Sequence, residues 1–250
     1  MTSSATVMLN TGLFLWAATP DAAQAACSAS GALASGSTVT CTGTQTTRVG
    51  QGPGADNVTV TVKNGATVSA TNTAAISLHD NATVTLGTSG PTPGGSASNA
   101  PVVVQVTTNS GAGPGTYKTG NNAIDVGSNS TILINRNVSV IARGTQITSE
   151  AVNPIGTGNR IINYGLIQGG PSSAIFFENR GATATDPRNV VDNFGTIQLD
   201  RTAGSNRFTG GQAVSSHGNV GIDFINESGA KVIGNLQLQG GNDRVTFNPG

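Results

Sequence analysis

The histidine at position 217 has the most catalytic-looking surroundings in this sequence. It lies in the stretch SSHGNVGID, where Ser215, Ser216 and Asp223 supply the other residue types of a serine hydrolase triad. However, the sequence contains no G-x-S-x-G turn that would present a nucleophilic serine. Gly218 follows the histidine directly and indicates a turn. We therefore interpret His217 as part of a polar loop and not as a catalytic base.

The remaining titratable residues are isolated in the sequence. His79, the other of the two histidines, lies in LHDNA, which is typical of a corner between strands. Glycosidases need two facing carboxyl groups, but Asp192 and Asp200 flank a predicted strand without an obvious mate. The stretch GGNDRVTF resembles half of a calcium-binding repeat and occurs once. We expect no catalytic residues, no metal site and no cofactor, so the chain is not expected to be an enzyme.

Short β-strands are the elements that would have to position these residues. NVTVTVKNGATVSAT (57–71) and AAISLHDNATVTLG (74–87) place β-branched residues at every second position. Segments rich in Gly, Pro or small polar residues interrupt this pattern and indicate exposed loops, where recognition usually takes place. These predicted loops are Thr88–Pro101, Asn109–Gly115 and Ala182–Arg188.

Two phrases return in the same order after about residue 120, in units about 40–50 residues apart. The first combines a polar residue, Ala and Ile or Val, as in NAIDV (122–126), SAIFF (173–177) and QAVSS (212–216). The second is built around an asparagine, as in ILINRNVSV, DNFGTI and FINESGAKV. Fixed strands separated by loops of variable length are typical of a β-solenoid. We therefore predict an all-β, right-handed parallel β-helix with loop insertions.

The asparagine phrase predicts the corners of this helix. Asn tolerates left-handed backbone geometry, and its amide can bond the Asn one turn away. Gly then adopts a second unusual dihedral at no steric cost, and Ile restarts an inward-facing strand. The alternative is a β-sandwich with Asn–Gly hairpin turns, which would not predict a fixed order of phrases. The expected equivalent corners are Asn163–Gly165–Ile167, Asn193–Gly195–Ile197 and Asn226–Gly229–Val232.

The N-terminus resembles an export signal. An apolar stretch, Leu13 to Ala18, precedes Pro20 and the A-x-A site AQA, so residues 1–25 form a signal-like segment and residues 26–250 the mature region. No Lys or Arg precedes Arg48, so the true start is expected upstream of Met1, or the chain is trimmed. Because an exported chain enters an oxidising compartment, we expect Cys27 and Cys41, the only cysteines, to form a disulfide.

Composition limits the choice of partners. Twelve basic and twelve acidic residues give a net charge of zero, so no basic field attracts nucleic acid. Aromatic residues make up only 4% of the chain, so the core must consist of Val, Ile, Leu and Ala. Recurrent Val/Ile runs and zero net charge argue against a disordered chain.

Taken together, the signal-like start, the early cysteine pair, the N-x-G-x-I turns and the closing GNLQLQGGNDRVTFNPG resemble the passenger region of a bacterial autotransporter. The resemblance implies a β-helical passenger at the cell surface or outer membrane of a Gram-negative bacterium, or secreted from it. It implies a structural or adhesive role without a catalytic site. The implied partners are an outer-membrane translocator barrel encoded outside this chain and a host or cell-surface glycan or protein. The alternative is an exported β-helical enzyme that acts on polysaccharide.

Overall fold

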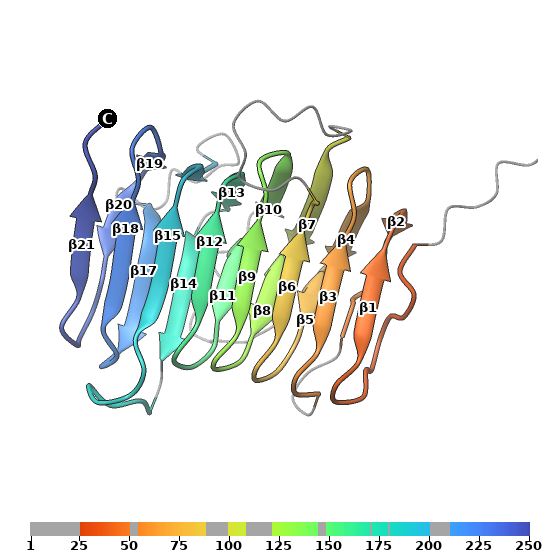
Figure 1. The fold of residues 1–250 in the computed structure, drawn as a ribbon, viewed down its shortest axis with the longest axis horizontal. Helices are drawn as coiled ribbons and strands as arrows, with labels where there is room; N and C mark the ends of the chain where they lie inside the picture. Colours follow the sequence, from red (N-terminus) through yellow and green to blue (C-terminus); the bar gives the residue numbers. More distant parts are fainter. Residues whose placement is uncertain are drawn as a thin grey trace, which may run out of the picture.

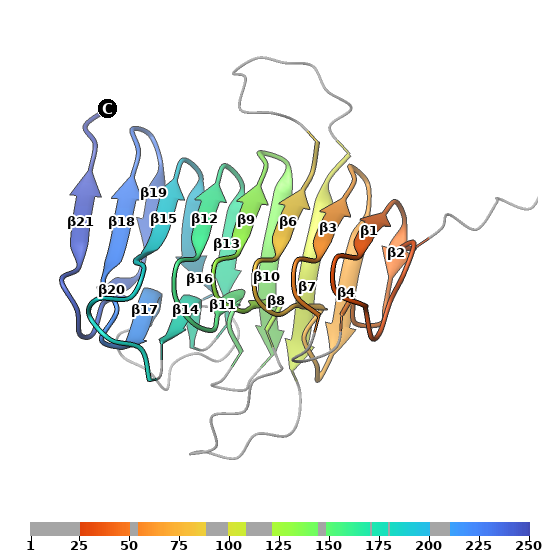
Figure 2. The same cartoon turned by 60° about the horizontal axis from the view of Figure 1, so that its bottom comes forward.

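A computed structural model describes residues 26–50, 55–88, 100–108, 122–144, 149–170, 172–179, 181–200 and 211–250. These residues form strands, turns and bends, which coil into a parallel β-helix with three sheets (Figures 1 and 2). Among them there is no helix that could cross a membrane. The fold class predicted from the sequence, a parallel β-helix with loop insertions, is confirmed. The signal-like segment lies outside the described residues.

Three sheets run along the coil, and we call them A, C and B in the order in which each turn visits them. Sheet A contains β1 (Thr38–Cys41), β3 (Thr59–Val62), β6 (Thr83–Leu86), β9 (Thr131–Ile134), β12 (Arg160–Asn163), β15 (Asn189–Asn193), β18 (Ile222–Asn226) and β21 (Arg244–Phe247). Sheet C contains β2 (Thr44–Gln45), β4 (Thr67–Thr71), β7 (Val102–Thr108), β10 (Val138–Gly144), β13 (Leu166–Gly169), β16 (Thr196–Leu199) and β19 (Lys231–Ile233). Sheet B contains β5 (Ile76–Ser77), β8 (Ile124–Val126), β11 (Val152–Pro154), β14 (Ser173–Asn179), β17 (Gln212–Gly218) and β20 (Asn235–Gln237).

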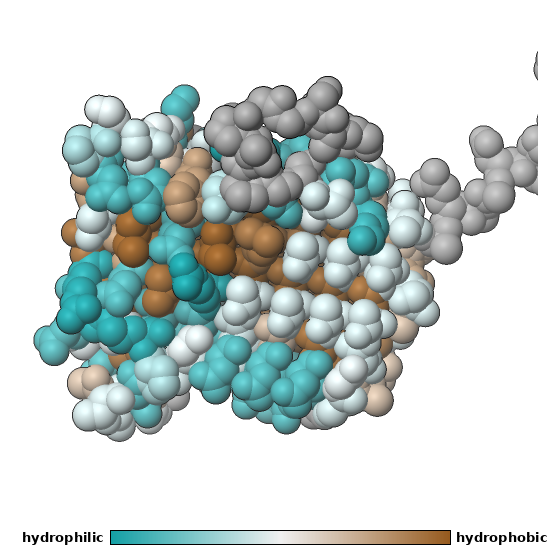
Figure 3. Space-filling model, in the orientation of Figure 1, coloured by the Kyte–Doolittle hydropathy of each residue, from teal (hydrophilic) through white to brown (hydrophobic). Residues whose placement is uncertain are grey.

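Alternation along each strand sends every second side chain inward, where it stacks on its equivalent in the next turn. Since the strands pair in parallel and in register, like side chains form columns along the axis. The central inward column of sheet A contains six aliphatic residues followed by a phenylalanine, and all seven are buried. They are Val39, Val60, Val84, Ile132, Ile161, Val191 and Phe224. Polar residues cover much of the outer face of this sheet (Figure 3).

The turns of the helix are shorter than the sequence phrases indicated. Equivalent residues are 29 positions apart from Ser130 to Asn159 and 30 apart from Asn163 to Asn193. The phrases NAIDV and SAIFF lie two turns apart, because Val152 of the intervening EAVNP pairs with both Ile124 and Ile175. The spacing of about 40–50 residues was therefore wrong for this part of the coil. EAVNP has the same opening of a polar residue, Ala and Val, and it is the intervening unit.

The three predicted Asn corners are equivalent in space. Asn163 pairs with Asn193, and Asn193 pairs with Asn226, at the C-terminal ends of β12, β15 and β18. Ile167 pairs with Ile197, and Ile197 with Val232, although the third corner has two more residues than the others.

The mechanism predicted for these corners was only partly right. The three asparagines are not among the residues with positive φ, so they do not use left-handed geometry. Of the corner glycines, only Gly229 does, with φ 77°. Gly165 and Gly195 serve close packing instead, because a Cβ on Gly195 would lie 2.2 Å from the carbonyl oxygen of Gly165. The backbone of successive turns approaches too closely there for a side chain.

Candidate functional site

Three of the four left-handed asparagines among the described residues lie at a different corner, which leads from sheet B into sheet A. Asn57, Asn81 and Asn129 have φ of 60°, 56° and 58°. Each backbone N–H at this corner donates to a carbonyl one turn further on, as in Asn81 to Ser128 at 2.8 Å. We call this series of turns the B–A corner. Its sequence signal is a recurring x-Asn-x-Thr-Val/Ile phrase, in DNVTV, DNATV and SNSTI, which the sequence analysis missed.

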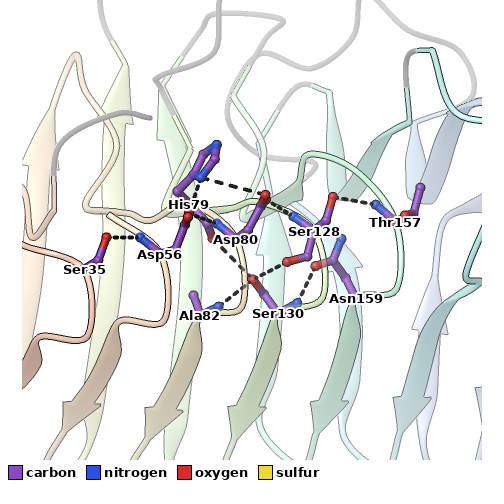
Figure 4. A network of polar contacts seen from close by, with 9 residues as sticks. All are labelled: Ser35, Asp56, His79, Asp80, Ala82, Ser128, Ser130, Thr157 and Asn159. Atoms are coloured by element: carbon purple, nitrogen blue, oxygen red, sulfur yellow. Dashed lines mark hydrogen bonds and ion pairs between the residues drawn. The ribbon is translucent and has the colours of Figure 1, made fainter. Parts of the chain in front are cut away.

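His79 lies at this corner, as its sequence context predicted, and joins a polar network that links several turns (Figure 4). Its Nδ1 contacts Oδ1 of Asp56, which belongs to the preceding turn. The Oδ2 of Asp80 lies 3.9 Å from the same nitrogen. The backbone N–H of Ser128 donates to Oδ1 of Asp80 at 2.7 Å, so the carboxylates of two turns are held in line. Figure 4 shows these side chains side by side along the corner.

Charge pairing sets the protonation of this cluster. The hydrogen bond to Asp56 raises the pKa of His79 above its usual value. The hydrogen bond from His79 lowers the pKa of Asp56 in turn. Both side chains are about two-fifths exposed, so water screens the pair and its contribution to stability is small.

One imidazole nitrogen and two carboxylate oxygens, all within 4.8 Å of one another, are a donor set that could hold a divalent metal ion. Each carboxylate already accepts a backbone hydrogen bond from the next turn. Asp56 accepts from the N–H of Asp80 at 3.3 Å, and Asp80 accepts from the N–H of Ser128 at 2.7 Å. The imidazole would have to exchange its bond to Asp56 for the metal. These bonds favour a structural role for the corner, and the expectation of no metal stays a prediction.

A second polar cluster lies on sheet B and is buried. Asp125 in β8 is 3% exposed, and Glu150, one turn further on, is 6% exposed. The Nδ2 of Asn122 donates to Asp125 at 2.7 Å and to Oδ1 of Asn153 at 3.1 Å. The Oδ1 of Asn122 accepts the backbone N–H of Glu150 at 2.9 Å. One buried amide therefore connects the two acidic turns.

Burial favours the neutral forms of these acids. It raises the pKa of Asp125 to about 7 and that of Glu150 to about 8. The amide of Asn122 and the positive charge of Arg48 act against the shift at Asp125. Glu178, on the following turn, raises the pKa of both acids by repulsion. Three acids therefore gather on successive turns, which the sequence analysis did not find, because the residues are far apart in the chain and the missing turn hid their register.

The structure does not assemble a triad around His217. The residue lies at the exposed side of strand β17, in register with Glu178, and not in a loop as predicted. The strand continues through it because β14 offers a partner to pair with. The hydroxyl of Ser215 bonds that of Ser173 at 2.7 Å. The Oγ of Ser216 accepts the backbone N–H of Gln239 at 2.8 Å, and Asp223 bonds Arg188 at 2.6 Å, so both serines and the acid have other partners.

The structure also places Asp192 and one of the three predicted loops. Asp192 forms an ion pair with Arg160 from the preceding turn, which lies 2.7 Å from its Oδ2. The loop Ala182–Arg188 is held by a turn in which Thr183 N–H donates to Oδ2 of Asp186 at 2.6 Å. The loop Asn109–Gly115 and residues 89–99 of Thr88–Pro101 lie outside the described residues.

Cys27 and Cys41 are joined by a disulfide in this structure. Cys41 is fully buried and begins an inward column that continues with Val62, Leu86 and Ile134. The bridge therefore fastens the N-terminal segment across the first turn.

Comparison with known proteins finds no matching family model, no similar curated protein and no similar solved structure.

Proposed function

We propose that this chain is the rigid β-helical passenger of an exported protein of the autotransporter type, with a structural or adhesive role. It would act at the surface of a Gram-negative bacterium, or after secretion from it. The observation that carries the proposal is the continuous stack of eight strands in sheet A. A rod in which each turn is paired on both sides positions its corners and loops firmly, as a recognition surface requires.

Two further features support export and attachment. A disulfide on the first turn suits an oxidising compartment. A catalytic triad around His217 would need Ser215 and Asp223, but both side chains bond to other residues. An outer-membrane barrel encoded outside this chain would translocate the passenger. Its attachment partner would be a host or cell-surface glycan or protein, since zero net charge does not favour nucleic acid.

The test measures binding and cleavage together. The purified chain is applied to a panel of bacterial and host glycans, and to host cells. We expect retention on some of these without release of shortened products. Replacing residues 89–99 by a short Gly/Ser linker should weaken attachment but keep the melting transition. His217→Ala should change neither binding nor stability. Glycan cleavage that His217→Ala abolishes without loss of stability would overturn the proposal.

The buried acids favour a second candidate, a β-helical enzyme that acts on polysaccharide. A carboxyl group with a raised pKa is what a general acid requires, and Asp125 and Glu150 both have one. Their burial means that a substrate could reach them only after local opening. If Asp125→Asn and Glu150→Gln each abolished product formation without loss of stability, this second function would replace the first.

A further inference from the structure

Seven threonines form a regular array on the outer face of sheet A. They occupy outward positions of four successive strands and alternate with buried residues along each strand. The strands pair in register without a bulge, so the hydroxyls lie in two parallel columns. The first column consists of Thr38, Thr59, Thr83 and Thr131, and the second of Thr40, Thr61 and Thr85. We call these residues the threonine array.

The fold fixes the spacing of the array in two directions. Adjacent strands lie about 4.8 Å apart, and alternate residues of one strand lie about 6.6 Å apart. Threonine is β-branched, so few side-chain rotamers are available and each methyl and hydroxyl keeps its place. In the part of the chain that the structure describes, none of the seven threonine hydroxyls takes part in a hydrogen bond. The hydroxyls face solvent as a two-dimensional grid.

Strand preference alone does not explain the array. Threonine is a good strand former at solvent-facing positions, but the same column continues beyond Thr131 with Arg160, Val190 and Asp223. The second column continues beyond Thr85 with Leu133. The uniform part ends where the ion pair between Arg160 and Asp192 begins. In Figure 3 the array forms the regular pale rows on the right-hand half of the face.

We propose that the threonine array binds the surface of ice. A grid that repeats in two directions fits a ligand that also repeats in two directions, and ice repeats its oxygen atoms at spacings close to those of stacked β-strands. Each hydroxyl would hold a water of the outermost ice layer, while each methyl group would lie between such waters. Because the scaffold is rigid, little conformational entropy is lost when many weak contacts form together.

The chemistry of the array favours ice over other repeating ligands. Crystalline polysaccharide is bound by aromatic faces together with amide or carboxylate groups, and the array contains neither. Protein interfaces are anchored at their centre by aromatic side chains or arginine, and Thr61 and Thr85, with Thr59 and Thr83 beside them, occupy the centre of this surface. The attachment role proposed above does not depend on this surface.

Ice partition tests the proposal directly. The full chain, with a fluorescent protein fused after Gly250, is half-frozen slowly beside free fluorescent protein, and the fraction of each in the ice is measured. The fusion should be enriched in the ice and should shape growing crystals. Thr61→Lys places a long charged side chain in the middle of the array and should lower the enrichment to that of free fluorescent protein. Thr196→Lys, at an outward position of sheet C, is the matched control and should behave like the parent.

Two results would overturn the inference. The parent fusion could partition like free fluorescent protein, or a folded Thr61→Lys variant could stay as enriched as the parent. Circular dichroism and melting show whether each variant folds. If the lysine variant fails to fold, the double variant Thr61→Val and Thr85→Val is tested in its place. Valine keeps the branched shape and removes only the hydroxyls. It should lose enrichment, and parent-like enrichment would overturn the proposal.

Discussion

The Nδ2 of Asn163 donates a hydrogen bond of 2.8 Å to Oδ1 of Asn193, one turn further along the coil. Asn193 repeats this bond to Asn226 at 2.7 Å. All three side chains point into the interior and are buried. In the preceding turns the same column is apolar, with Ile134 paired to Asn163. An amide ladder therefore continues an aliphatic column, and each bond sets the register of two turns.

Removal of the middle amide should destabilise the coil. Asn193→Ala removes the donor to Oδ1 of Asn226, and it leaves Nδ2 of Asn163 only its longer bond to the carbonyl of Thr196 at 3.3 Å. The loss of a buried partner costs about 1–3 kcal/mol. Gln198→Ala is the matched control, because Gln198 donates to Gln168 at 2.8 Å at the outer surface. We expect this change to cost less than about 0.5 kcal/mol. Urea denaturation measures both, and equal midpoints would show that the inner ladder contributes nothing.

The two types of corner glycine should differ in their response to alanine. Gly195→Ala places a Cβ against the carbonyl of Gly165, so the turns must separate, and overpacking of this kind costs about 1–3 kcal/mol. Gly229→Ala meets no atom within 4 Å, and its cost is the left-handed conformation alone, about 1 kcal/mol. Thermal melting should therefore rank Gly195→Ala as the less stable variant. The reverse order would contradict the close packing at that corner.

Stability should fall as the pH rises from about 4 to about 8. Asp125 and Glu150 have folded pKa values of about 7 and about 8, above their ordinary values, so the folded chain binds more protons than the unfolded chain in this window. Their neutral forms are stable inside the protein, and ionisation inside costs free energy.

Isosteric replacements isolate this effect from other titrating groups. The double variant Asp125→Asn and Glu150→Gln cannot ionise at these positions. At pH 9 it should exceed the parent in free energy of unfolding by at least about 1.4 kcal/mol, which corresponds to one pKa unit. Chemical denaturation at several pH values gives both curves. A difference that does not change with pH would mean that the two acids are not buried in the folded chain.

The disulfide should stabilise the N-terminal end. The bridge from Cys27 to Cys41 closes a loop of about 15 residues, which corresponds to about 3 kcal/mol in the chain-entropy model. Cys27→Ser with Cys41→Ala should lower the melting temperature and expose Val39 and Val60 to hydrogen exchange before residues near Ile161. Alkylation of the denatured, secreted chain should detect no free thiol. Two reactive thiols would reject the pairing.

Strand alternation predicted the fold well because inward and outward residues differ along each strand. TVTV at Thr59–Val62 and TVTL at Thr83–Leu86 read directly as half-buried strands, and they pair in register. The Asn corners were found for the same reason, since each is followed within four to six residues by an inward Ile or Val. Their backbone geometry was misassigned, because Asn–Gly has two uses, a left-handed turn or a close approach of two backbones. A single sequence does not distinguish them.

Contacts between turns depend on turn length, which varies along this chain. Asp125 and Glu150 are neighbours because the turn that contains EAVNP lies between NAIDV and SAIFF, and the phrase spacing of about 40–50 residues left that turn out. Asp56 and His79 meet for a similar reason, across 23 residues. The partner of Asp192 is 32 residues away at Arg160. Clusters of this kind can be predicted only after each turn has been counted correctly.

The location of the chain tests the central proposal most directly. Antibodies against residues 26–250 are added to intact cells that produce the protein, with and without external protease, and the thiols of the recovered chain are counted. The proposal predicts labelling of intact cells, loss of the label after protease treatment and no free thiol. A chain that is labelled only after lysis, resists external protease and carries two reduced cysteines would contradict it.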